Sequence, residues 1–417
     1  MKNADICAEP HSDLLGVAEA VERLLADVEP VQGAERTPLK GAMGRILAED
    51  ILSPVDIPRH RISAMDGYAI RSSDIPAVGS TATLTVVGTS WAGRPFQERL
   101  EAGQCARIFT GAVVPEQPDT IVMQEQVDRR GNHIVIDADI TPYDHIRHPG
   151  DDIKAGQRIL EKGRQLDAAD LGILASIGTV HVSVKPKVRV AFFSTGDELR
   201  PLGSALQPGE LYESNRYTLH GLLQPLTVEP LDMGVIPDRQ PELERAFAEA
   251  SDISDVIITT GGVSVGDADL VKPTLEQMGR VNFWKIAMKP GKPLAYGTIG
   301  PCRFFGLPGN PVSVMVTFLE IVRPALMKMM GAQLKSPLRL QVPCQSRLKK
   351  APGRQEFQRG LLARDQNGAL SVTGCGAQDS HILSSMSRAN CFIVLPPDCA
   401  GVEAGDSVEV EPFDVML

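Results

Sequence analysis

Residues 256–269 have the sequence VIITTGGVSVGDAD, a β-branched apolar run that ends in paired glycines and is followed by acidic residues. A similar run, VRVAFFS at 188–194, is followed by Thr195-Gly196-Asp197-Glu198. Short apolar runs separated by amphipathic segments are typical of buried parallel strands in α/β domains. The expected elements alternate along this part of the chain: strands at 188–194, 228–235 and 256–260, and helices at 215–223, 241–250 and 270–278. We therefore predict a doubly wound α/β domain at 185–333, closed by a long apolar helix at 311–330.

The sequence on both sides of this domain has a different pattern. Helical periodicity covers 12–28 and 166–177, and a second short helix is expected at 39–47. Between these segments, β-branched runs are separated by Gly, Pro and Asp, at 81–87, 106–109, 120–127 and 133–136. We predict an inserted β domain at 54–147 within a discontinuous helical linker domain of residues 12–53 and 148–184. Further β runs and an Asn367-Gly368 turn predict a C-terminal β domain at 334–417.

Composition and charge exclude several classes of protein. The 417 residues are 43% hydrophobic and 23% charged, an ordinary globular composition that excludes a disordered or fibrous chain. The 42 Lys+Arg against 52 Asp+Glu give a net charge of -10, which argues against binding to nucleic acid. The cysteines form no C-x-x-C pair, which disfavours structural zinc and indicates a reducing compartment. A polar N-terminus and the lack of an apolar run of about 18 residues predict a cytoplasmic protein without membrane contact.

Residues that follow the two quoted strands are the first candidates for a binding site. Ligands of an open parallel sheet bind at the carboxyl ends of its strands. Glycines there let backbone N–H groups approach an anion or a heterocycle, and carboxylates can hold Mg²⁺. The alternative is an ordinary strand-to-helix turn with a capping Asp. The binding candidates at these two strand ends are Thr195, Gly196, Asp197, Gly261, Gly262, Ser264 and Gly266.

A second group of candidates is cationic. The segment KIAMKPGKP at 285–293 carries Lys285, Lys289 and Lys292 on an expected loop whose prolines and glycine fix its path. The segment GLPGNP at 306–311 leads into a helix N-terminus, which favours an anion. Its binding candidates are Pro308, Gly309, Asn310 and Pro311. Because lysines and carboxylates converge on one sheet edge, we favour an anion site over a solvated charged face. No H-E-x-x-H, G-x-S-x-G or G-x-x-x-x-G-K-[ST] motif occurs, which disfavours zinc hydrolase, serine hydrolase and P-loop chemistry.

Two acidic residues outside the α/β domain are also candidates. Asp66 lies in SAMDGYA at 63–69, and Asp152 lies in GDDI at 150–153. Each has a local alternative. Asp66 and the glycine after it fit a hairpin turn, and Asp152 fits a helix or turn cap.

Nine motifs along the chain, in the order in which they occur, resemble those of the MoeA family of molybdopterin molybdenumtransferases. The C-terminal part of gephyrin is the animal counterpart of this family. The motifs cover essentially the whole chain: SAMDGYAIR at 63–71, RIFTGA at 107–112, GDDI at 150–153, FSTGDEL at 193–199, TTGGVSVGDAD at 259–269, FWKIAMKPGKP at 283–293, GLPGNPVS at 306–313, FQRG at 357–360 and SHILSSMS at 380–387. The resemblance implies that adenylylated molybdopterin and molybdate are converted to molybdenum cofactor and AMP, with Mg²⁺ as cofactor.

The resemblance also implies roles for residues at matching positions. The implied catalytic residues are the acids Asp66, Asp152, Glu198, Asp238 and Asp269, with Lys285 and Lys289 as cationic partners. Asp267 ranks below Asp269, because the family tolerates other acids at its position. The flanking β domains contribute Thr110, Arg359 and Ser380. We hypothesise that Glu198 and Asp269 hold Mg²⁺ and phosphate, and that the two lysines hold molybdate or substrate phosphate.

Assembly and partners follow from the resemblance as well. It implies a homodimer with a shared site, in which Asp66 and Thr110 act across the interface, and the molybdopterin adenylyltransferase as a partner. Two alternative functions are open. One is a non-catalytic, gephyrin-like scaffold, and the other is a molybdopterin adenylyltransferase on the same α/β fold. The adenylyltransferases resemble only residues 187–330, so the β domains on both sides favour the insertase.

Overall fold

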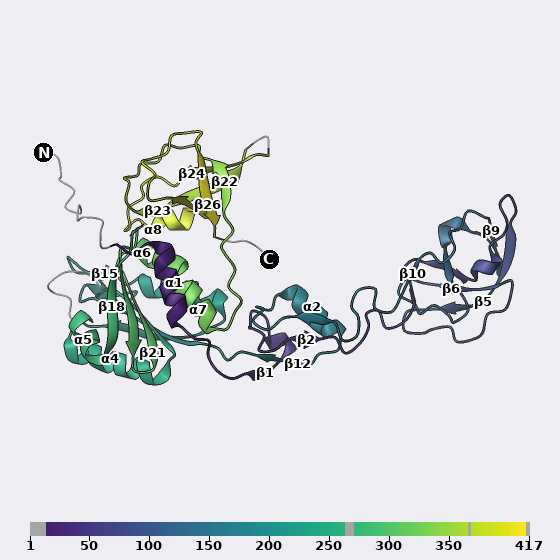
Figure 1. Ribbon diagram of the computed structural model, residues 1–417, viewed down its shortest axis with the longest axis horizontal. Coiled ribbons are helices and arrows are strands. Elements are labelled where there is room, and N and C mark those ends of the chain that lie inside the picture. The colour runs from purple at the N-terminus through teal and green to yellow at the C-terminus, as the bar shows by residue number, and fades with distance from the viewer. Residues whose placement is uncertain (1–13, 263–270, 366–367, 414–417) are drawn as a thin grey trace. The chain divides into compact units, whose positions relative to one another are not determined.

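The computed structural model describes residues 14–262, 271–365 and 368–413 (Figure 1). Contacts divide the chain into two compact units, which are described separately. Unit 1 comprises Met1–Ala48, Gly163–Asp167 and Val182–Leu417, and unit 2 comprises Glu49–Lys162 and Ala168–His181. The four domain boundaries expected from the sequence remain predictions. No helix in the described part of the chain is long and apolar enough to cross a membrane.

Unit 1 contains a six-stranded sheet in the order β16-β13-β17-β21-β20-β18. Its strands are β13 (Arg189–Thr195), β16 (Glu229–Ile236), β17 (Val256–Thr260), β18 (Gly279–Lys285), β20 (Pro293–Ile299) and β21 (Cys302–Leu307). Strands β16, β13, β17 and β21 pair in parallel, and β20 runs antiparallel to both of its neighbours. The α/β fold is confirmed, but the sheet is mixed, because a tight turn at Gly300 returns β20 directly into β21.

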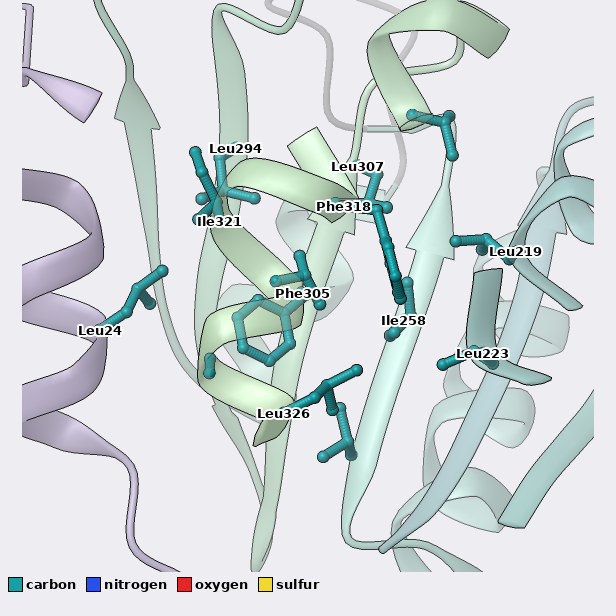
Figure 2. Close-up of a cluster of buried hydrophobic side chains, with 14 of the residues drawn as sticks. Leu24, Leu219, Leu223, Ile258, Leu294, Phe305, Leu307, Phe318, Ile321 and Leu326 are labelled. Carbon is teal, nitrogen blue, oxygen red and sulfur yellow. The ribbon is translucent and has the colours of Figure 1, made fainter. Parts of the chain in front are cut away.

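Helices cover both faces of this sheet. They are α1 (Val17–Asp27), α3 (Asn215–Leu223), α4 (Gln240–Ile253), α5 (Val271–Met278), α6 (Pro311–Thr317) and α7 (Arg323–Met329). Alternate residues of one strand point to opposite faces, so Phe192 joins the core beneath α1, α3, α6 and α7, and Phe193 joins the core beneath α4 and α5. Figure 2 shows the first of these cores, where Leu24 of α1 and Phe305 of β21 belong to one buried cluster. Both faces are therefore buried, which explains the continuous apolar runs.

One helical prediction needs correction. The expected helix at 39–47 is only a 3₁₀ turn, η2 (Leu39–Gly41), followed by an extended segment in which Leu47 bridges Val184. Gly44 explains the difference, because its φ of 73° lies outside the helical region and a Cβ there would lie 2.5 Å from Thr227. Helix α1 lies within the helix predicted at 12–28, and it shares its buried core with the sheet of unit 1.

The predicted helix at 311–330 forms, but it contains a π turn, η6 (Phe318–Val322), between α6 and α7. Pro324 has no N–H to donate to the carbonyl of Glu320, four residues earlier. The N–H of Arg323 instead donates to the carbonyl of Phe318, five residues earlier, which is the hydrogen bond of a π turn.

The rest of unit 1 is mainly β structure. The C-terminal strands are β22 (Leu340–Pro343), β23 (Gln355–Arg364), β24 (Leu370–Gly374), β25 (Cys391–Leu395) and β26 (Ser407–Pro412), with helix α8 (Leu383–Arg388). Their sheet has the order β19-β23-β25-β26-β22, and β24 pairs with β23. Strand β19 (Met288–Lys289) comes from the segment KIAMKPGKP, which the sequence predicted to be a loop. The remaining strands pair as β1 (Glu35–Pro38) with β12 (His181–Val184) and β14 (Leu199–Arg200) with β15 (Leu211–Tyr212).

Unit 2 contains the β structure predicted between the helical segments. Its main sheet has the order β7-β4-β6-β5-β9-β8. These strands are β4 (Gly67–Ile70), β5 (Ala82–Ser90), β6 (Gln104–Ile108), β7 (Thr120–Met123), β8 (Asp128–Arg130) and β9 (His133–Ile136). Short pairs join β3 (Ile62–Ser63) to β10 (Ile146–Arg147) and β2 (Ile51–Leu52) to β11 (Arg158–Leu160), and α2 (Ala168–Ser176) completes the unit. Strand β7 is shorter than predicted, because Gln124–Gln126 form a 3₁₀ turn.

The buried carboxyl group of Glu320, in the π turn, leads to a prediction about how the stability of the fold depends on pH. Oε1 of Glu320 is buried without a hydrogen-bond partner among the described residues. Burial, with a smaller effect of the Glu411 carboxylate, raises the pKa of Glu320 from 4.5 to about 8, against the opposing effect of Arg339 and Arg323. Between these two pH values the folded state holds a proton that the unfolded state has lost. The free energy of unfolding therefore falls as the pH rises, by at most about 1.4 kcal/mol per pH unit.

We expect Glu320→Gln to remove this loss of stability. The difference in melting temperature between the variant and the wild type should grow in favour of the variant from pH 5 to pH 9. Thermal unfolding followed by circular dichroism measures it, with Glu22→Gln, an exposed position on α1, as the control. A difference that stays constant over this pH range would contradict the prediction.

Candidate functional site

A cleft of about 450 Å³ opens at the carboxyl ends of β17 and β21, within unit 1. Its lining comes from four segments that are far apart in the sequence. They are the turn after β17, the segment between β19 and β20, the residues after β21, and the C-terminal β region. The lining residues are Gly261, Gly262, Lys289, Pro290, Gly291, Lys292, Pro293, Pro308, Gly309, Asn310, Ser313, Arg354, Gln378, Asp379 and Ser380.

Steric reasons require glycine at several of these positions, of which Gly262 and Gly291 are two examples. Gly262 has a φ of 65°, and a Cβ on it would lie 2.2 Å from Cγ2 of Val271. Gly291 has a φ of 105°, and its Cβ would lie 2.5 Å from Oγ1 of Thr317. The backbone therefore approaches its neighbours closely at both positions, and it forms part of the cleft wall.

The lining carries more positive than negative charge. Lys289, Lys292 and Arg354 are its cations, and Asp379 is its carboxylate. Nζ of Lys289 lies 3.5 Å from Oε1 of Glu356, which is 5% exposed, while the lysine side chain is 47% exposed. Because an ammonium group has three donors, this ion pair still leaves Lys289 able to bind an anion in the cleft.

Ser380 is fixed at the start of α6. Its Oγ accepts a hydrogen bond of 3.0 Å from Nδ2 of Asn310, and its carbonyl accepts one of 3.1 Å from the N–H of Val312. The second contact uses one of the N–H groups that the predicted anion site at this helix start would offer. An anion in the cleft would instead meet the Ser380 hydroxyl, which can still donate its own hydrogen.

Arg359 lies behind the cleft wall and is fully buried. Its Nε donates to Oγ of Ser385 at 3.0 Å, and its Nη2 donates to the carbonyls of Asp379 at 3.1 Å and Ala377 at 3.5 Å. Burial lowers the pKa of its guanidinium group. Arg359, predicted as a binding residue, is thus placed to position the wall segment 377–380 and is not part of the lining.

The acidic residues after β13 form a second group at the same end of the sheet. The N–H of Asp238 donates to Oδ1 of Asp197 at 3.3 Å. The carboxylate of Glu198 folds over Gly196, where a Cβ would lie 2.7 Å from Oε2. Thr195 borders Gly261 and Gly262 of the cleft, since a Cβ on Gly261 would lie 2.7 Å from its carbonyl oxygen and a Cβ on Gly262 would lie 3.0 Å from its Oγ1.

Sequence reasoning missed two polar residues near these strands, the buried Glu213 and the half-buried Asn215. Glu213 is 2% exposed and accepts hydrogen bonds from Oγ of Ser194 and the N–H of Arg216. Asn215 donates from Nδ2 to the carbonyl of Gly309 at 2.7 Å. Oε2 of Glu213, Oδ1 of Asn215 and Oγ1 of Thr195 have no hydrogen-bond partner in the described part of the chain. The sequence signal for these residues was the polar run Glu213-Ser214-Asn215, at the start of the predicted helix at 215–223.

Unit 2 holds the three other predicted residues. Thr110 donates from both its N–H and its Oγ1 to Oδ1 of Asp66, each at 2.8 Å. These hydrogen bonds, the backbone one first, together with the charge of Arg107, lower the pKa of Asp66 from 3.8. Asp66 lies in a bend directly before β4, and Gly67 is the first residue of that strand. The strands on either side of the bend, β3 and β4, pair with other strands, so Asp66 and Gly67 do not form the hairpin turn of the alternative interpretation. Asp152 is exposed beside Asp151, which accepts a hydrogen bond from the N–H of His148.

The structure brings only some of the predicted residues together. The cleft contains Gly261, Gly262, Lys289, Lys292, Pro308, Gly309, Asn310 and Ser380. Lys285 and Pro311 lie beside it in sequence but do not line it. Ser264, Gly266, Asp267 and Asp269 lie outside the described residues. Arg354, Gln378 and Ser313 line the cleft and were missed, because only the folded chain brings them to it.

The carboxylates described here do not form a dense cluster. Within residues 14–262, 271–365 and 368–413, no group of three or more His, Cys, Asp or Glu side chains could hold a metal ion by itself. A metal bound here would therefore take further ligands from a substrate, from water or from residues outside this range.

Three family models match the chain in order. They are the MoeA N-terminal region (domains I and II) at residues 15–178, a probable molybdopterin binding domain at 191–328, and the MoeA C-terminal region (domain IV) at 341–413. The fold and cleft thus define a protein with an α/β domain of the molybdopterin-binding type, flanked by the two regions that accompany it in MoeA proteins.

Individual relatives agree with these models. A molybdopterin molybdenumtransferase of Haemophilus influenzae is 43% identical, over 97% of this chain and 100% of its own length. A gephyrin of Dictyostelium discoideum is 34% identical, over 94% of this chain and 61% of its own. The crystal structure of a MoeA protein from Pyrococcus horikoshii has a TM-score of 0.83 and 31% identity, covering 96% of this chain and 100% of that one. The chain belongs to the MoeA family of molybdopterin molybdenumtransferases, as the motifs indicated.

The pair formed by Asp66 and Thr110 generates a prediction. Thr110→Val removes the Oγ1 donor and keeps the N–H donor, so the pKa of Asp66 should rise and still remain below 3.8. Carbon-13 NMR titration of the Asp66 carboxyl group measures this change. Any stability that the hydrogen-bonded pair contributes is present above pH 3.8, the ordinary pKa of the carboxyl group. It is lost as the pH falls through the lowered pKa of Asp66 in the folded state. Thr110→Ser is the matched control, and an unchanged pKa in the valine variant would contradict the assignment.

Proposed function

We propose that the protein is a molybdenum insertase, which inserts molybdate into the dithiolene of adenylylated molybdopterin and releases AMP in a Mg²⁺-dependent reaction. A general role in molybdenum-cofactor biosynthesis is supported by the family and by the name of the Haemophilus influenzae relative. The specific reaction, insertion of molybdate with release of AMP, is supported by the cleft, whose lining combines cations with glycine-rich strand ends. Such a lining suits an oxyanion and a phosphate together.

Lys289, Lys292 and Arg354 would bind the anionic groups, since they come from two segments that are far apart in the sequence but lie in one lining. The hydroxyl of Ser380 would donate to molybdate, because its oxygen already accepts from Asn310. Arg359 would act indirectly by holding segment 377–380 in place. Lys285 stays a candidate partner for phosphate on the family resemblance.

The carboxylates that follow β13 are suitable ligands for a magnesium ion. Mg²⁺ takes oxygen ligands and is usually held by one or two carboxylates with waters and substrate phosphates. Asp197 and Glu198 are adjacent exposed carboxylates, and the bare Cα of Gly196 leaves room for both oxygens of Glu198. We propose that Glu198 and Asp269 hold the ion, with Asp238 orienting Asp197 through its N–H. When bound, Mg²⁺ would offset the charge of the phosphates and polarise the bond to AMP.

The remaining parts of the proposal rest on the family resemblance alone. They are a homodimer, a role for Asp66, Thr110 and Asp152 in the reaction, and the adenylyltransferase as the partner that supplies the substrate. A cytoplasmic location is proposed from the cysteine pattern, which indicates a reducing compartment. The adenylyltransferase function itself is the less favoured alternative, because family models match the regions on both sides of the α/β domain. The scaffold function is represented among the relatives by the gephyrin.

The direct test loads the purified protein with adenylylated molybdopterin and Mg²⁺, adds molybdate, and measures AMP together with pterin-bound molybdenum. Release of AMP that depends on molybdate supports the insertase. AMP transfer from ATP to molybdopterin without molybdate would instead identify an adenylyltransferase. Substrate that binds and is never cleaved would identify a non-catalytic relative.

The cleft cations generate a quantitative prediction. Lys289→Ala removes a charged donor from the lining, and we expect the molybdate concentration at half-maximal AMP release to rise about ten-fold. Lys335→Ala, an exposed lysine elsewhere in unit 1, is the matched control and should behave like the wild type. An unchanged molybdate dependence in Lys289→Ala would contradict the assignment of this lysine.

A further inference from the structure

Four planar side chains form a continuous column in unit 2 that the proposed chemistry does not yet use. Cζ of Arg107 lies 4.9 Å from the ring centroid of Tyr68 and 4.9 Å from that of Phe109. The ring of Phe109 stacks on Trp91, with centroids 4.2 Å apart and an angle of 14° between the planes. The order of the column is therefore Tyr68, Arg107, Phe109 and Trp91, a run of cation–π and stacked aromatic contacts.

Strand pairing builds this column. The antiparallel pairing of β4 with β6 sets Tyr68 opposite Arg107. The parallel pairing of β5 with β6 sets Ser90 beside Ile108, so Trp91 and Phe109 are the first residues after the ends of these two neighbouring strands. Arg107 is held by hydrogen bonds from Nη1 to the carbonyl of Gly67 and from Nη2 to Oε1 of Gln124. The column is thus preorganised and does not depend on a ligand.

The two ends of the column differ in exposure. Tyr68 is 3% exposed, whereas Trp91 is 48% exposed. A large aromatic side chain that is stacked on one face and open to solvent on the other offers a flat surface of fixed orientation. Such surfaces bind the π faces of fused heterocycles, because every such ring can stack on them.

The turn that carries Trp91 adds a cation beside the open ring. Trp91 and Arg94 exchange backbone hydrogen bonds of 3.0 and 2.9 Å across the turn, so their side chains emerge on the same face. Arg94 is exposed. The turn is anchored by Phe96, whose ring lies against Gly88 and whose N–H donates to Oγ of Ser90 at 3.3 Å. A guanidinium next to an open aromatic face fits a heterocycle that carries a phosphate.

The column also adjoins two residues that the family resemblance assigns to the reaction. Thr110 directly follows Phe109 in the chain, and both of its donors bind Asp66. The ring on which Trp91 stacks is therefore the direct chain neighbour of a residue in this hydrogen-bonded pair.

We propose that the open face of Trp91 stacks on a planar fused nitrogen heterocycle of the substrate, with Arg94 beside its phosphate. This inference adds a binding residue to the proposed function. Only the identity of the ligand depends on that function, whereas the stacking surface does not. Two sources share this chemistry, the adenine of the AMP group and the pterin ring. Trp91 is in this account a binding and positioning residue, and its loss weakens substrate binding about ten-fold.

Fluorescence tests the contact without requiring turnover. The chain has two tryptophans, Trp91 and Trp284, so Trp284→Phe leaves Trp91 as the only indole. AMP and 6-hydroxymethylpterin are titrated separately into this full-length variant. Saturable quenching by one of them supports the proposal and identifies the source. If neither ligand quenches saturably, the proposal is wrong.

Substitutions then separate stacking from a structural role. Trp91→Ala should raise the dissociation constant of the quenching ligand and the KM for adenylylated molybdopterin about ten-fold with kcat unchanged, as expected for uniform binding. Trp91→Phe should restore most of the affinity, because it keeps a ring. Tyr143→Ala removes an aromatic side chain that is 68% exposed elsewhere in unit 2 and should change neither value. Circular dichroism checks that each variant is folded.

The outcomes distinguish this inference from the proposed function. If the wild type releases AMP with molybdate and Trp91→Ala keeps the wild-type KM and ligand affinity, the stacking site is wrong and the insertase stands. If the wild type releases no AMP but Trp91 is still quenched saturably and the alanine variant loses the affinity, the stacking site stands and the insertase is wrong.

Discussion

The burial of both faces of the sheet in unit 1 is the constraint on which the rest of that unit depends. Phe192 and Phe193 are adjacent in β13, and each is fully buried in a different core. A strand whose two faces are both covered has no side chain left for a ligand along its length. Chemistry is therefore confined to the ends of the strands, and the glycine-rich turns after β17 and β21 are where the cleft opens.

The cleft acquires its charge because the chain leaves the α/β sheet between β18 and β20. There Met288 and Lys289 form β19, which pairs with β23 of the C-terminal sheet. This pairing sets Lys289 beside Glu356 and brings the C-terminal residues Arg354 and Ser380 into the same lining. The second β region thus completes the wall of the site, which an isolated α/β domain could not do.

Local patterns predicted much of this structure. The helix at 215–223 and the strand at 256–260 match the sequence expectation, because each depends on a pattern within a few residues. The helix expected at 39–47 failed at Gly44, whose conformation is set by contacts with distant residues. Arg354 in the cleft, the hydrogen bonds between Asp66 and Thr110, and the stacking of Trp91 depend on strand register, which spacing along the chain does not reveal.

We propose that the cleft of unit 1 binds the oxyanion molybdate. Tungstate, a tetrahedral oxyanion of similar size and charge to molybdate, can be soaked into crystals of the full-length protein and located by its anomalous scattering. We expect a single strong anomalous peak in the cleft, within hydrogen-bond distance of Ser380 and of at least one cation among Lys289, Lys292 and Arg354. A strong peak elsewhere, with none in the cleft, would contradict it.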